Sequence, residues 1–295
     1  MMRYLALLFS LTALVAAGAA PASADSASEY TNFVGMQFVN IPAGEFLMGS
    51  CKPGAPGTCL DERAASPFAS KDEFPQHRVS IPAFQLGVHE VSFGQYQQFM
   101  KDTGSEDLQD KHFSKFNVHG AQAPVVYVTR DEAQAFIAWL NQSRPESDQG
   151  RYRLPTESEW EYAARAHSLG SYPWGDEIGK NNANCKNCGS EWGGVSPAPV
   201  GSFAANAFGV HDMIGNVWEW LEDCAHPNYR NAPTDGSAWI TKCSDAKGVD
   251  NGHVVRGGSW DSDAINLRSA YRNSYPHDAA SDVVGFRVVR DLSGQ

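Results

Sequence analysis

The order of apolar and polar positions along the chain predicts short strands separated by turns. Apolar side chains alternate with polar ones in Met36–Ile41, and short apolar runs follow at His77–Ile81 and Phe84–Val88. A period of two places one face of an extended segment in the core, so each run predicts a strand. Four further strands are expected at Pro124–Val128, His253–Arg256, Asn266–Arg272 and Gly285–Val289.

Two segments instead show helical spacing together with the residues that begin or end a helix. Phe93–Thr103 follows Ser92, a preferred N-cap residue, and stops before Gly104. The second helix begins after Thr129 and places four apolar residues on one face: Ala133, Phe136, Ile137 and Leu140. Both segments are therefore predicted to be amphipathic helices.

A third helix has the clearest local signal in the chain. Thr156 can cap it, and Glu159, three residues later, completes a capping box in which each side chain bonds the other residue's backbone N–H. Trp160, Ala163 and Ala164 then form an apolar stripe. We expect this helix to belong to the scaffold and not to the chemistry of the protein.

Length and composition favour one large α+β domain with short strands, few helices and little regular structure. The chain has 295 residues, with 8 tryptophans, 27 glycines and 16 prolines, which is typical of a loop-rich protein with an aromatic core. Segments 50–76, 172–206 and 222–250 show no clear period and are expected to be loops. The net charge of −11 argues against nucleic acid or anionic lipid as a partner. We expect a monomer.

Residues 1–24 have the organisation of a signal peptide. A basic residue, Arg3, precedes the apolar run Leu5–Ala20, and Ala22–Ala24 is similar to a cleavage site. The run is short for a membrane span and no later run is as long, so no span is expected in the mature chain. A retained N-terminal anchor is the alternative. The mature protein is expected to be periplasmic or secreted, with a polar lead from 25 to 37.

All six cysteines lie in the part that would be exported. An even number in an oxidising compartment favours disulfides, although six cysteines allow about fifteen pairings. Three local bonds are the economical choice: Cys51–Cys59, Cys185–Cys188 and Cys224–Cys243. The C-x-x-C spacing of the second pair also suits a redox dithiol or half of a zinc site. No βαβ pattern precedes it and no second C-x-x-C follows, which favours a structural bond.

The segment Gly209–Trp220 combines two carboxylates with a tight turn. Asp212 and Glu219 can supply oxygens to a hard cation, as can the backbone carbonyls of Gly215 and Val217. Calcium takes about six to eight such oxygens in flexible geometry, so the spacing is compatible with it. From the spacing alone, the simpler interpretation is an Asx turn beside two tryptophans that fill the core.

Five motifs carry a resemblance to a known family. They are RLPTESEWEYAARA (Arg153–Ala166), PWGDE (Pro173–Glu177), GVHDMIGNVWEW (Gly209–Trp220), RGGSW (Arg256–Trp260) and GFRVVRD (Gly285–Asp291). In this order they resemble the formylglycine-generating-enzyme, or sulfatase-modifying-factor, family. The resemblance runs from about Phe38 to Leu292. It implies a single domain over 38–292, related to the C-type lectin fold.

The resemblance also implies metal sites. Asp212, Gly215, Val217 and Glu219 each match a ligand of the family's second calcium site, which shifts the balance towards an ion. Asn184 matches a ligand of the first calcium site, but the downstream acidic ligand of that site has no secure counterpart here. We therefore expect one structural calcium ion.

The copper site of the family is not expected. Formylglycine-generating enzymes oxidise a substrate cysteine with dioxygen, using copper(I) held by two thiolates shortly after the GGS motif, and soft thiolates suit that ion. Segment 257–268 contains no cysteine, and Ser262 lies where the first thiolate would be. Whether the protein is an enzyme is therefore left open.

Five residues near this segment are candidates for a functional pocket. Trp218 matches the tryptophan beside the family's oxygen site, and Ser259 is the serine of GGS; Asp261, Ser262 and Arg268 supply polar groups nearby. Such groups can perform acid–base chemistry or bind a polar ligand. The alternatives are a core tryptophan, a turn serine and a solvated rim.

Three functions are consistent with the sequence. The first is an exported protein that acts, by oxidative or related chemistry, in the maturation of a peptide or peptide-derived molecule. A cysteine-free relative that matures the chromophore of the siderophore pyoverdine shows that the family can act without the copper pair. The second is a non-catalytic ligand-binding module, and the third is a true formylglycine-generating oxidase with an atypical site.

Overall fold

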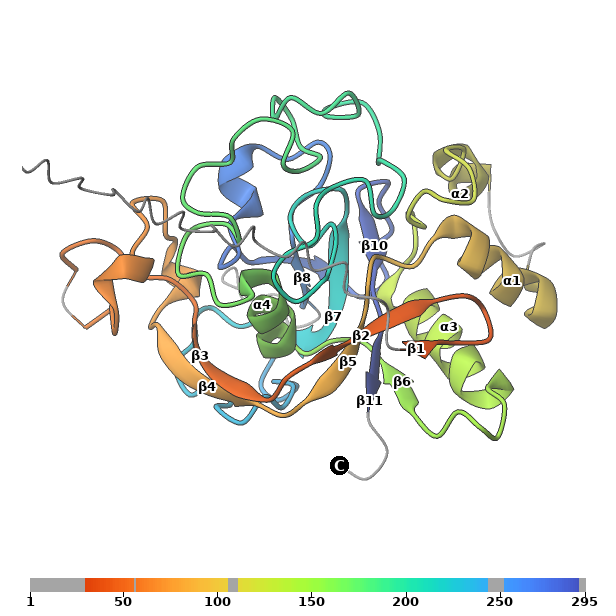
Figure 1. Cartoon of the computed structure of the whole chain (residues 1–295), viewed down its shortest axis with the longest axis horizontal. Coiled ribbons are helices and arrows are strands. Elements are labelled where there is room, and N and C mark those ends of the chain that lie inside the picture. The colour runs from red at the N-terminus through yellow and green to blue at the C-terminus, as the bar shows by residue number, and fades with distance from the viewer. Residues whose placement is uncertain (1–29, 56, 106–110, 244–251, 292–295) are drawn as a thin grey trace, which may run out of the picture.

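A computed structural model describes residues 30–55, 57–105, 111–243 and 252–291, so the predicted signal peptide lies outside the described residues. Within these ranges, three short sheets and a few helices are joined by long irregular segments, as expected for an α+β domain (Figure 1). The α-helices are α1 (Phe93–Thr103), α2 (Lys111–Phe116), α3 (Arg130–Ser143) and α4 (Glu157–Arg165). Helices α1, α2 and α3 lie at one end of the molecule, and the segment after the third strand lies at the other. None of the helices described is both long and apolar enough to cross a bilayer.

The largest sheet places the last strand of the chain between two early ones. Its strand order is β1–β2–β5–β11–β6, and every pairing is antiparallel. The bounds are β1 (Tyr30–Thr31), β2 (Gln37–Ile41), β5 (Phe84–Gly87), β11 (Val289–Asp291) and β6 (Arg151–Arg153). Because β11 pairs with both β5 and β6, the C-terminal segment joins the two halves of this sheet.

The second sheet has the order β10–β7–β8–β9, in which β10 pairs with β7 in parallel and the other pairs are antiparallel. Its strands are β10 (Val284–Phe286), β7 (Trp218–Cys224), β8 (Gly252–Arg256) and β9 (Asn273–Pro276). Strands β3 (Gly44–Met48) and β4 (His77–Ile81) form a separate antiparallel ribbon. Since β10 and β11 are consecutive, the C-terminal segment also connects the two larger sheets.

The predictions that rest on local signals are confirmed. Helix α1 has the predicted bounds, with Ser92 as its N-cap and Gly104 in the left-handed conformation at its end. Helix α3 begins after Thr129, and its four predicted apolar residues are buried. Strands β2, β4, β5 and β8 lie where alternation and short apolar runs predicted them.

The strand predicted at Pro124–Val128 is wrong. The segment makes only an isolated bridge at Pro124, and Tyr127 has a φ of 59°. The side chain of Asn117 accepts a hydrogen bond from the N–H of Val126 at 2.9 Å and donates one to its carbonyl at 2.8 Å. These backbone groups are thus bound to an amide side chain and do not pair with a strand.

The strand predicted at Asn266–Arg272 is also wrong. The segment continues a 3₁₀ helix, Ala264–Leu267, into a turn, and β9 begins only at Asn273. Arg268 and Arg272 are both buried here and directed to carboxylates, so the polar positions do not form the exposed face of a strand. Helix α2 was missed, because residues 109–122 show no clear period.

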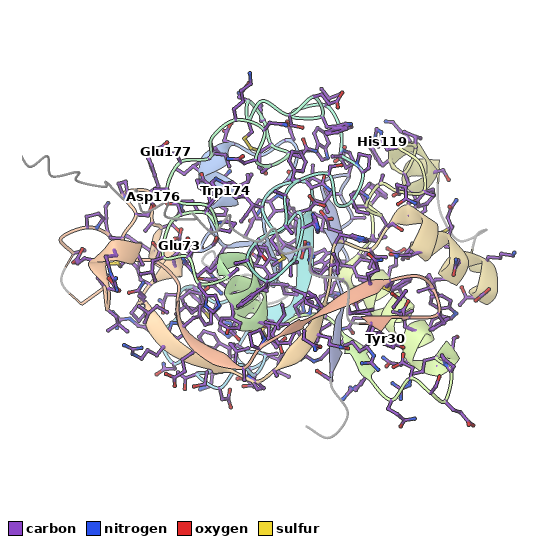
Figure 2. All side chains as sticks on the ribbon, in the orientation of Figure 1. Tyr30, Glu73, His119, Trp174, Asp176 and Glu177 are labelled. Carbon is purple, nitrogen blue, oxygen red and sulfur yellow. A yellow bond between two sulfur atoms is a disulfide. The ribbon has the colours of Figure 1, made fainter. Side chains whose placement is uncertain are left out.

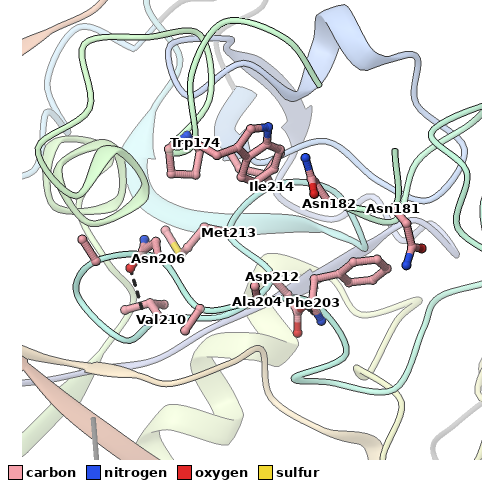
Figure 3. A pocket seen from close by; sticks show the side chains of 13 residues that line it. Trp174, Asn181, Asn182, Phe203, Ala204, Asn206, Val210, Asp212, Met213 and Ile214 are labelled. Carbon is pink, nitrogen blue, oxygen red and sulfur yellow. Dashed lines mark hydrogen bonds between the residues drawn. The ribbon is translucent and has the colours of Figure 1, made fainter. Parts of the chain in front are cut away.

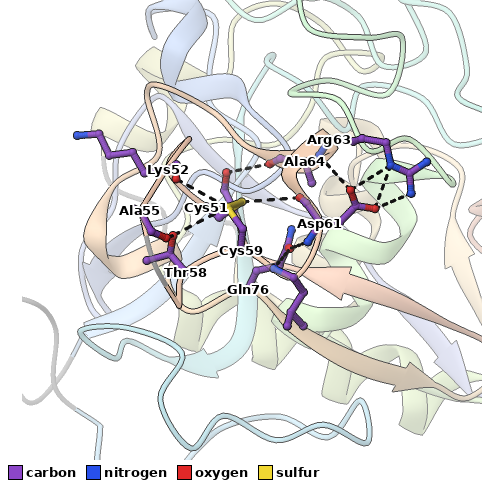
Figure 4. Close-up of a disulfide and its surroundings, with 12 residues drawn as sticks. Cys51, Lys52, Ala55, Thr58, Cys59, Asp61, Arg63, Ala64 and Gln76 are labelled. Carbon is purple, nitrogen blue, oxygen red and sulfur yellow. Dashed lines mark hydrogen bonds and ion pairs between the residues drawn. A yellow bond between two sulfur atoms is a disulfide. The ribbon is translucent and has the colours of Figure 1, made fainter.

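The three predicted disulfides are confirmed, and they contain all six cysteines of the chain. Cys51–Cys59 closes the irregular loop after β3, beside the 3₁₀ helix Glu62–Ala64 (Figure 4). In the same loop the side chain of Gln76 accepts hydrogen bonds from two backbone N–H groups at 2.9 Å each. Cys224–Cys243 clamps the loop after β7 as predicted, although 244–251 lie outside the described residues.

Helix α4 is buried on every side: all nine of its residues are inaccessible or nearly so. The capping box between Thr156 and Glu159 forms as predicted. The helix packs against β3, β4, β7 and β8, so it occupies the centre of the domain. A buried helix that carries carboxylates is stable only if those charges have partners.

Arginines from the chain after β7 neutralise the carboxylates of α4. Glu157 accepts hydrogen bonds from Arg272 at 2.6 and 2.8 Å and from Arg256 at 3.1 Å. Glu161 pairs with Arg256 at 2.5 Å and with Arg165 at 2.9 Å. Burial alone would raise the pKa of Glu157, but the charges of Arg272 and Arg256 outweigh it, and the pKa is lowered. The helix and the C-terminal segment therefore depend on each other.

We predict that Glu157→Gln lowers the free energy of unfolding by about 3–5 kcal/mol, because it leaves buried arginine charge without its carboxylate. Chemical denaturation of the purified protein measures the change. Glu146→Gln, at an exposed position, is the matched control and should change stability by less than about 0.5 kcal/mol. Equal effects for the two variants would contradict a structural role for the buried pair.

Candidate functional site

The turn after β8 brings two of the predicted pocket residues together. The hydroxyl oxygens of Ser259 and Ser262 lie 2.9 Å apart, and the N–H of Ser259 donates to Ser262 Oγ at 3.1 Å. Gly258, in the left-handed region with a φ of 82°, has no room for a side chain, since a Cβ atom would lie 2.6 Å from Leu267. The sharp turn expected from the Gly-Gly-Ser sequence is therefore present.

Trp218 lies in the aromatic core. It is 4% exposed, and its ring centroid lies 6.0 Å from that of Tyr271. Its backbone N–H donates to the carbonyl of Val283 at 2.8 Å, where β7 meets β10. In this arrangement Trp218 contributes to the packing of the core.

Arg268 and Asp261 do not join the two serines. Both terminal nitrogens of Arg268 donate to the carboxylate of Glu73, at 2.8 and 2.7 Å, and this pair holds the 3₁₀ helix Lys71–Glu73. Glu73 lies well inside the molecule (Figure 2). Asp261 is exposed at the surface. The structure thus assembles only the pair of serines from the five candidates.

Glu219 of the predicted calcium loop is bound to protein groups. Its carboxylate pairs with Arg287 through contacts of 2.8, 2.9 and 3.0 Å and accepts a hydrogen bond from the indole nitrogen of Trp160 at 2.8 Å. All three side chains are almost completely buried. Both carboxylate oxygens are therefore engaged, and an ion at this carboxylate would have to displace Arg287.

Asp212 is the other predicted acidic ligand. It is 4% exposed, has a φ of 57°, and accepts hydrogen bonds from the backbone N–H groups of Gly201 and Phe203. Burial raises the pKa of its carboxyl group to about 6, although these hydrogen bonds and Arg287 act in the opposite direction. None of the described salt bridges joins Asp212 to a positively charged side chain.

Glu90 adds a third carboxylate that the sequence gave no reason to choose. It is completely buried; Oε1 accepts a hydrogen bond from Asn216 at 3.0 Å, and Oε2 has no partner among the described residues. Burial raises its pKa well above the ordinary range, and the charge of Asp212 raises it further. Glu90, Asp212 and Glu219 thus surround one arginine, Arg287. Burial without a further cation makes the ionisation of Glu90 and Asp212 unfavourable, in agreement with their raised pKa values.

Asn216 connects this acidic group to Asn184, the residue that matches a ligand of the family's first calcium site. The Oδ1 atom of Asn216 accepts hydrogen bonds from Ala198 N–H at 2.8 Å and from the Asn184 amide at 3.2 Å. Asn184 is itself fully buried and donates to the carbonyl of Ser196 at 3.0 Å. The two asparagines therefore fix the irregular segment after PWGDE to the loop that carries Gly215 and Val217.

A cavity of about 280 Å³ adjoins the acidic group (Figure 3). It is lined by Pro173–Trp174, Asn181–Asn182, 203–207, Val210 and 212–214, and we name it the Trp174 pocket. No periodic pattern in the sequence indicates this pocket, because its walls come from three irregular segments that only the fold brings together. The exposed tryptophan of PWGDE was the one available signal.

Comparison with known proteins relates this chain to a family. The sulfatase-modifying factor enzyme 1-like domain matches residues 23–292. The formylglycine-generating enzyme of Mycobacterium tuberculosis is 28% identical over a region that covers 86% of this chain and 98% of that protein. Among solved structures, PvdO from Pseudomonas aeruginosa is 33% identical with a TM-score of 0.69, over 88% of this chain and 96% of that one.

Other relatives contain the domain as part of a longer protein. The serine/threonine-protein kinase Pkn1 of Chlamydia trachomatis is 31% identical over 75% of this chain, and hercynine oxygenase of Mycolicibacterium thermoresistibile is 29% identical over 88% of it. The aligned regions cover only 35% and 66% of those two proteins. This chain therefore belongs to the family of the sulfatase-modifying factor enzyme 1-like domain.

Proposed function

We propose that this protein is an exported member of its family that acts in the maturation of a peptide or peptide-derived molecule, without copper–thiolate chemistry. The relatives named for formylglycine generation and for hercynine oxygenation support an oxidative modification as the general activity. Export is supported by the signal-peptide pattern and by the three disulfides, which form in oxidising compartments.

The pairing of the cysteines is the observation that carries the proposal. Copper(I) requires soft ligands such as thiolates, and the three disulfides use all six cysteines of this chain. Where the family's first thiolate is expected, Ser262 offers a hydroxyl bound to Ser259. A hydroxyl is a hard, weakly acidic ligand, so this turn does not suit copper(I).

The second candidate is a non-catalytic module that binds a ligand. The Trp174 pocket is compatible with this candidate, because it offers a cavity for a ligand and Asp212 is the one titratable side chain among the described residues that line it. Genes near the one encoding this protein discriminate between the two candidates. Siderophore or peptide-synthetase genes would favour maturation, and genes for surface receptors or secretion would favour the binding module.

We also propose one structural calcium ion at the loop that carries Asp212. The excess of buried carboxylates over arginines supports a cation there, as does the unpartnered Oε2 atom of Glu90. In the present arrangement Glu219 is neutralised by Arg287. Asp212 and Glu90 are therefore the carboxylates that would hold the ion, with the carbonyls of the same loop.

The proposed function predicts that the purified protein does not convert a sulfatase-type cysteine peptide to formylglycine, with or without copper(I), because it lacks the thiolate pair. Mass spectrometry of the peptide after incubation in air measures conversion. The M. tuberculosis enzyme serves as the positive control. Copper-dependent conversion above the protein-free background would overturn the proposal and identify an oxidase with an atypical site.

The calcium proposal predicts that calcium raises the melting temperature of metal-free protein. A ligand that binds only the folded state stabilises it by about 2.7 kcal/mol at a hundredfold excess over its Kd, and sites of the extracellular type often have a Kd of about 0.1–1 mM. Differential scanning calorimetry with calcium or chelator measures the shift.

Asp212→Asn and Glu90→Gln should abolish the calcium response, because each removes a charge that the ion needs. The control is Glu177→Gln, an exposed carboxylate on the PWGDE loop, which should respond like the wild type. If calcium does not shift the melting temperature of verified metal-free wild type, the loop holds no ion.

A further inference from the structure

The Trp174 pocket has aromatic rings on two sides. Trp174 is 40% exposed, stacks on Tyr172 at an interplanar angle of 8°, and donates its indole N–H to the carbonyl of Glu177 at 2.9 Å. Figure 2 labels it near Asp176 and Glu177. Phe203 lies across the cavity from it (Figure 3). Because Tyr172 and Glu177 hold the indole in place, a flat ligand would meet a ring that is already ordered.

The inner wall of the pocket is apolar. Val210, Met213 and Ile214 are each no more than 3% exposed, and they form the wall between the two rings. The alanines of segment 203–207 add little bulk, which leaves the space open. A thioether such as that of Met213 makes favourable contacts with aromatic rings. The wall thus offers contact to carbon atoms and no hydrogen bonds from side chains.

Polar groups gather at one edge of the pocket. The side-chain amide of Asn181 makes no hydrogen bond with the described residues. The side chain of Asn182 makes one, in which Nδ2 donates to the carbonyl of Ile178 at 3.0 Å. Asn206 lies on the other side of the pocket (Figure 3), and its side chain already binds three backbone groups. At this edge the side-chain amide of Asn181 and the Oδ1 atom of Asn182 are therefore available to bind a ligand.

No positively charged side chain is among the described lining residues to attract an anionic ligand. Asp212 is the sole charged side chain among the described residues of the lining, and its carboxylate is bound by two backbone N–H groups. The cavity of about 280 Å³ has room for an aromatic ring, because a closed apolar cavity of about 150 Å³ is enough to bind benzene.

From these features we infer that the Trp174 pocket binds an aromatic ring with one polar substituent, of the kind carried by a tyrosine side chain. The ring would lie between Trp174 and Phe203, and its hydroxyl would reach the amide of Asn181. A sugar of the same size fits less well, since its hydroxyls would face Met213 and Ile214 and lose their hydrogen bonds to water. The inference rests on the proposed function, because it names a side chain of the peptide or peptide-derived substrate.

The test compares three probes by ligand-observed NMR titration: N-acetyltyrosine amide, N-acetylphenylalanine amide and methyl α-glucopyranoside. We expect the tyrosine probe to bind with a Kd on the order of 1 mM, the phenylalanine probe to bind more weakly, and the sugar not to bind. Absence of tyrosine binding, or equal binding of the sugar, would overturn the inference.

Two variants locate the binding. Trp174→Ala should weaken tyrosine binding about tenfold, because it removes the stacking surface. Asn181→Gly keeps the backbone at its φ of 59° without strain and removes the amide. It should therefore weaken the tyrosine probe and leave the phenylalanine probe unchanged. The control is Phe68→Ala, a ring 61% exposed outside the pocket, and melting curves confirm that each variant is folded.

The outcomes of this test and of the peptide assay are independent. If Trp174→Ala binds the tyrosine probe as well as the wild type does, the pocket is not the site, while the absence of formylglycine formation still stands. If the wild type forms formylglycine, the proposed function fails, although the probe can still bind. Each failure therefore points to one claim only.

Discussion

The buried charge pairs of α4 are the constraint on which the rest of the structure depends. The helix lies in the centre with no solvent-facing side, and its carboxylates Glu157 and Glu161 require arginines. Arg256 and Arg272 supply them from the chain around β8 and β9. Because an unpaired buried charge costs more than most single interactions contribute, the helix and the C-terminal segment must fold together.

This constraint explains what most of the shared motifs do. RLPTESEWEYAARA supplies the helix and its carboxylates, and RGGSW supplies Arg256. GVHDMIGNVWEW supplies Glu219, and GFRVVRD supplies Arg287, which pairs with Glu219 while Trp160 of α4 bonds the same carboxylate. These motifs therefore specify a scaffold. Trp174 of PWGDE remains exposed, and the irregular segments it begins carry the Trp174 pocket.

Local signals made part of this fold predictable. The caps of α1, α3 and α4 depend on residues three or four apart, and the disulfides join cysteines at most 19 residues apart. The buried ion pairs join residues that are far apart in the sequence: Glu157 and Arg272 are 115 residues apart, and Glu73 and Arg268 are 195 apart. No periodicity reveals such a partner, so the sequence does not show that Arg268 forms a buried pair with Glu73. Glu90 was missed for the same reason.

A double-mutant cycle between Glu161 and Arg256 tests the central claim most directly. The free energies of unfolding of the wild type, Glu161→Gln, Arg256→Met and the double variant give the coupling between the two side chains. If the pair holds α4 to β8, the coupling energy is about 2–3 kcal/mol, at the upper end for residues in contact. A coupling below about 0.5 kcal/mol would show that the two charges act independently and would contradict the account.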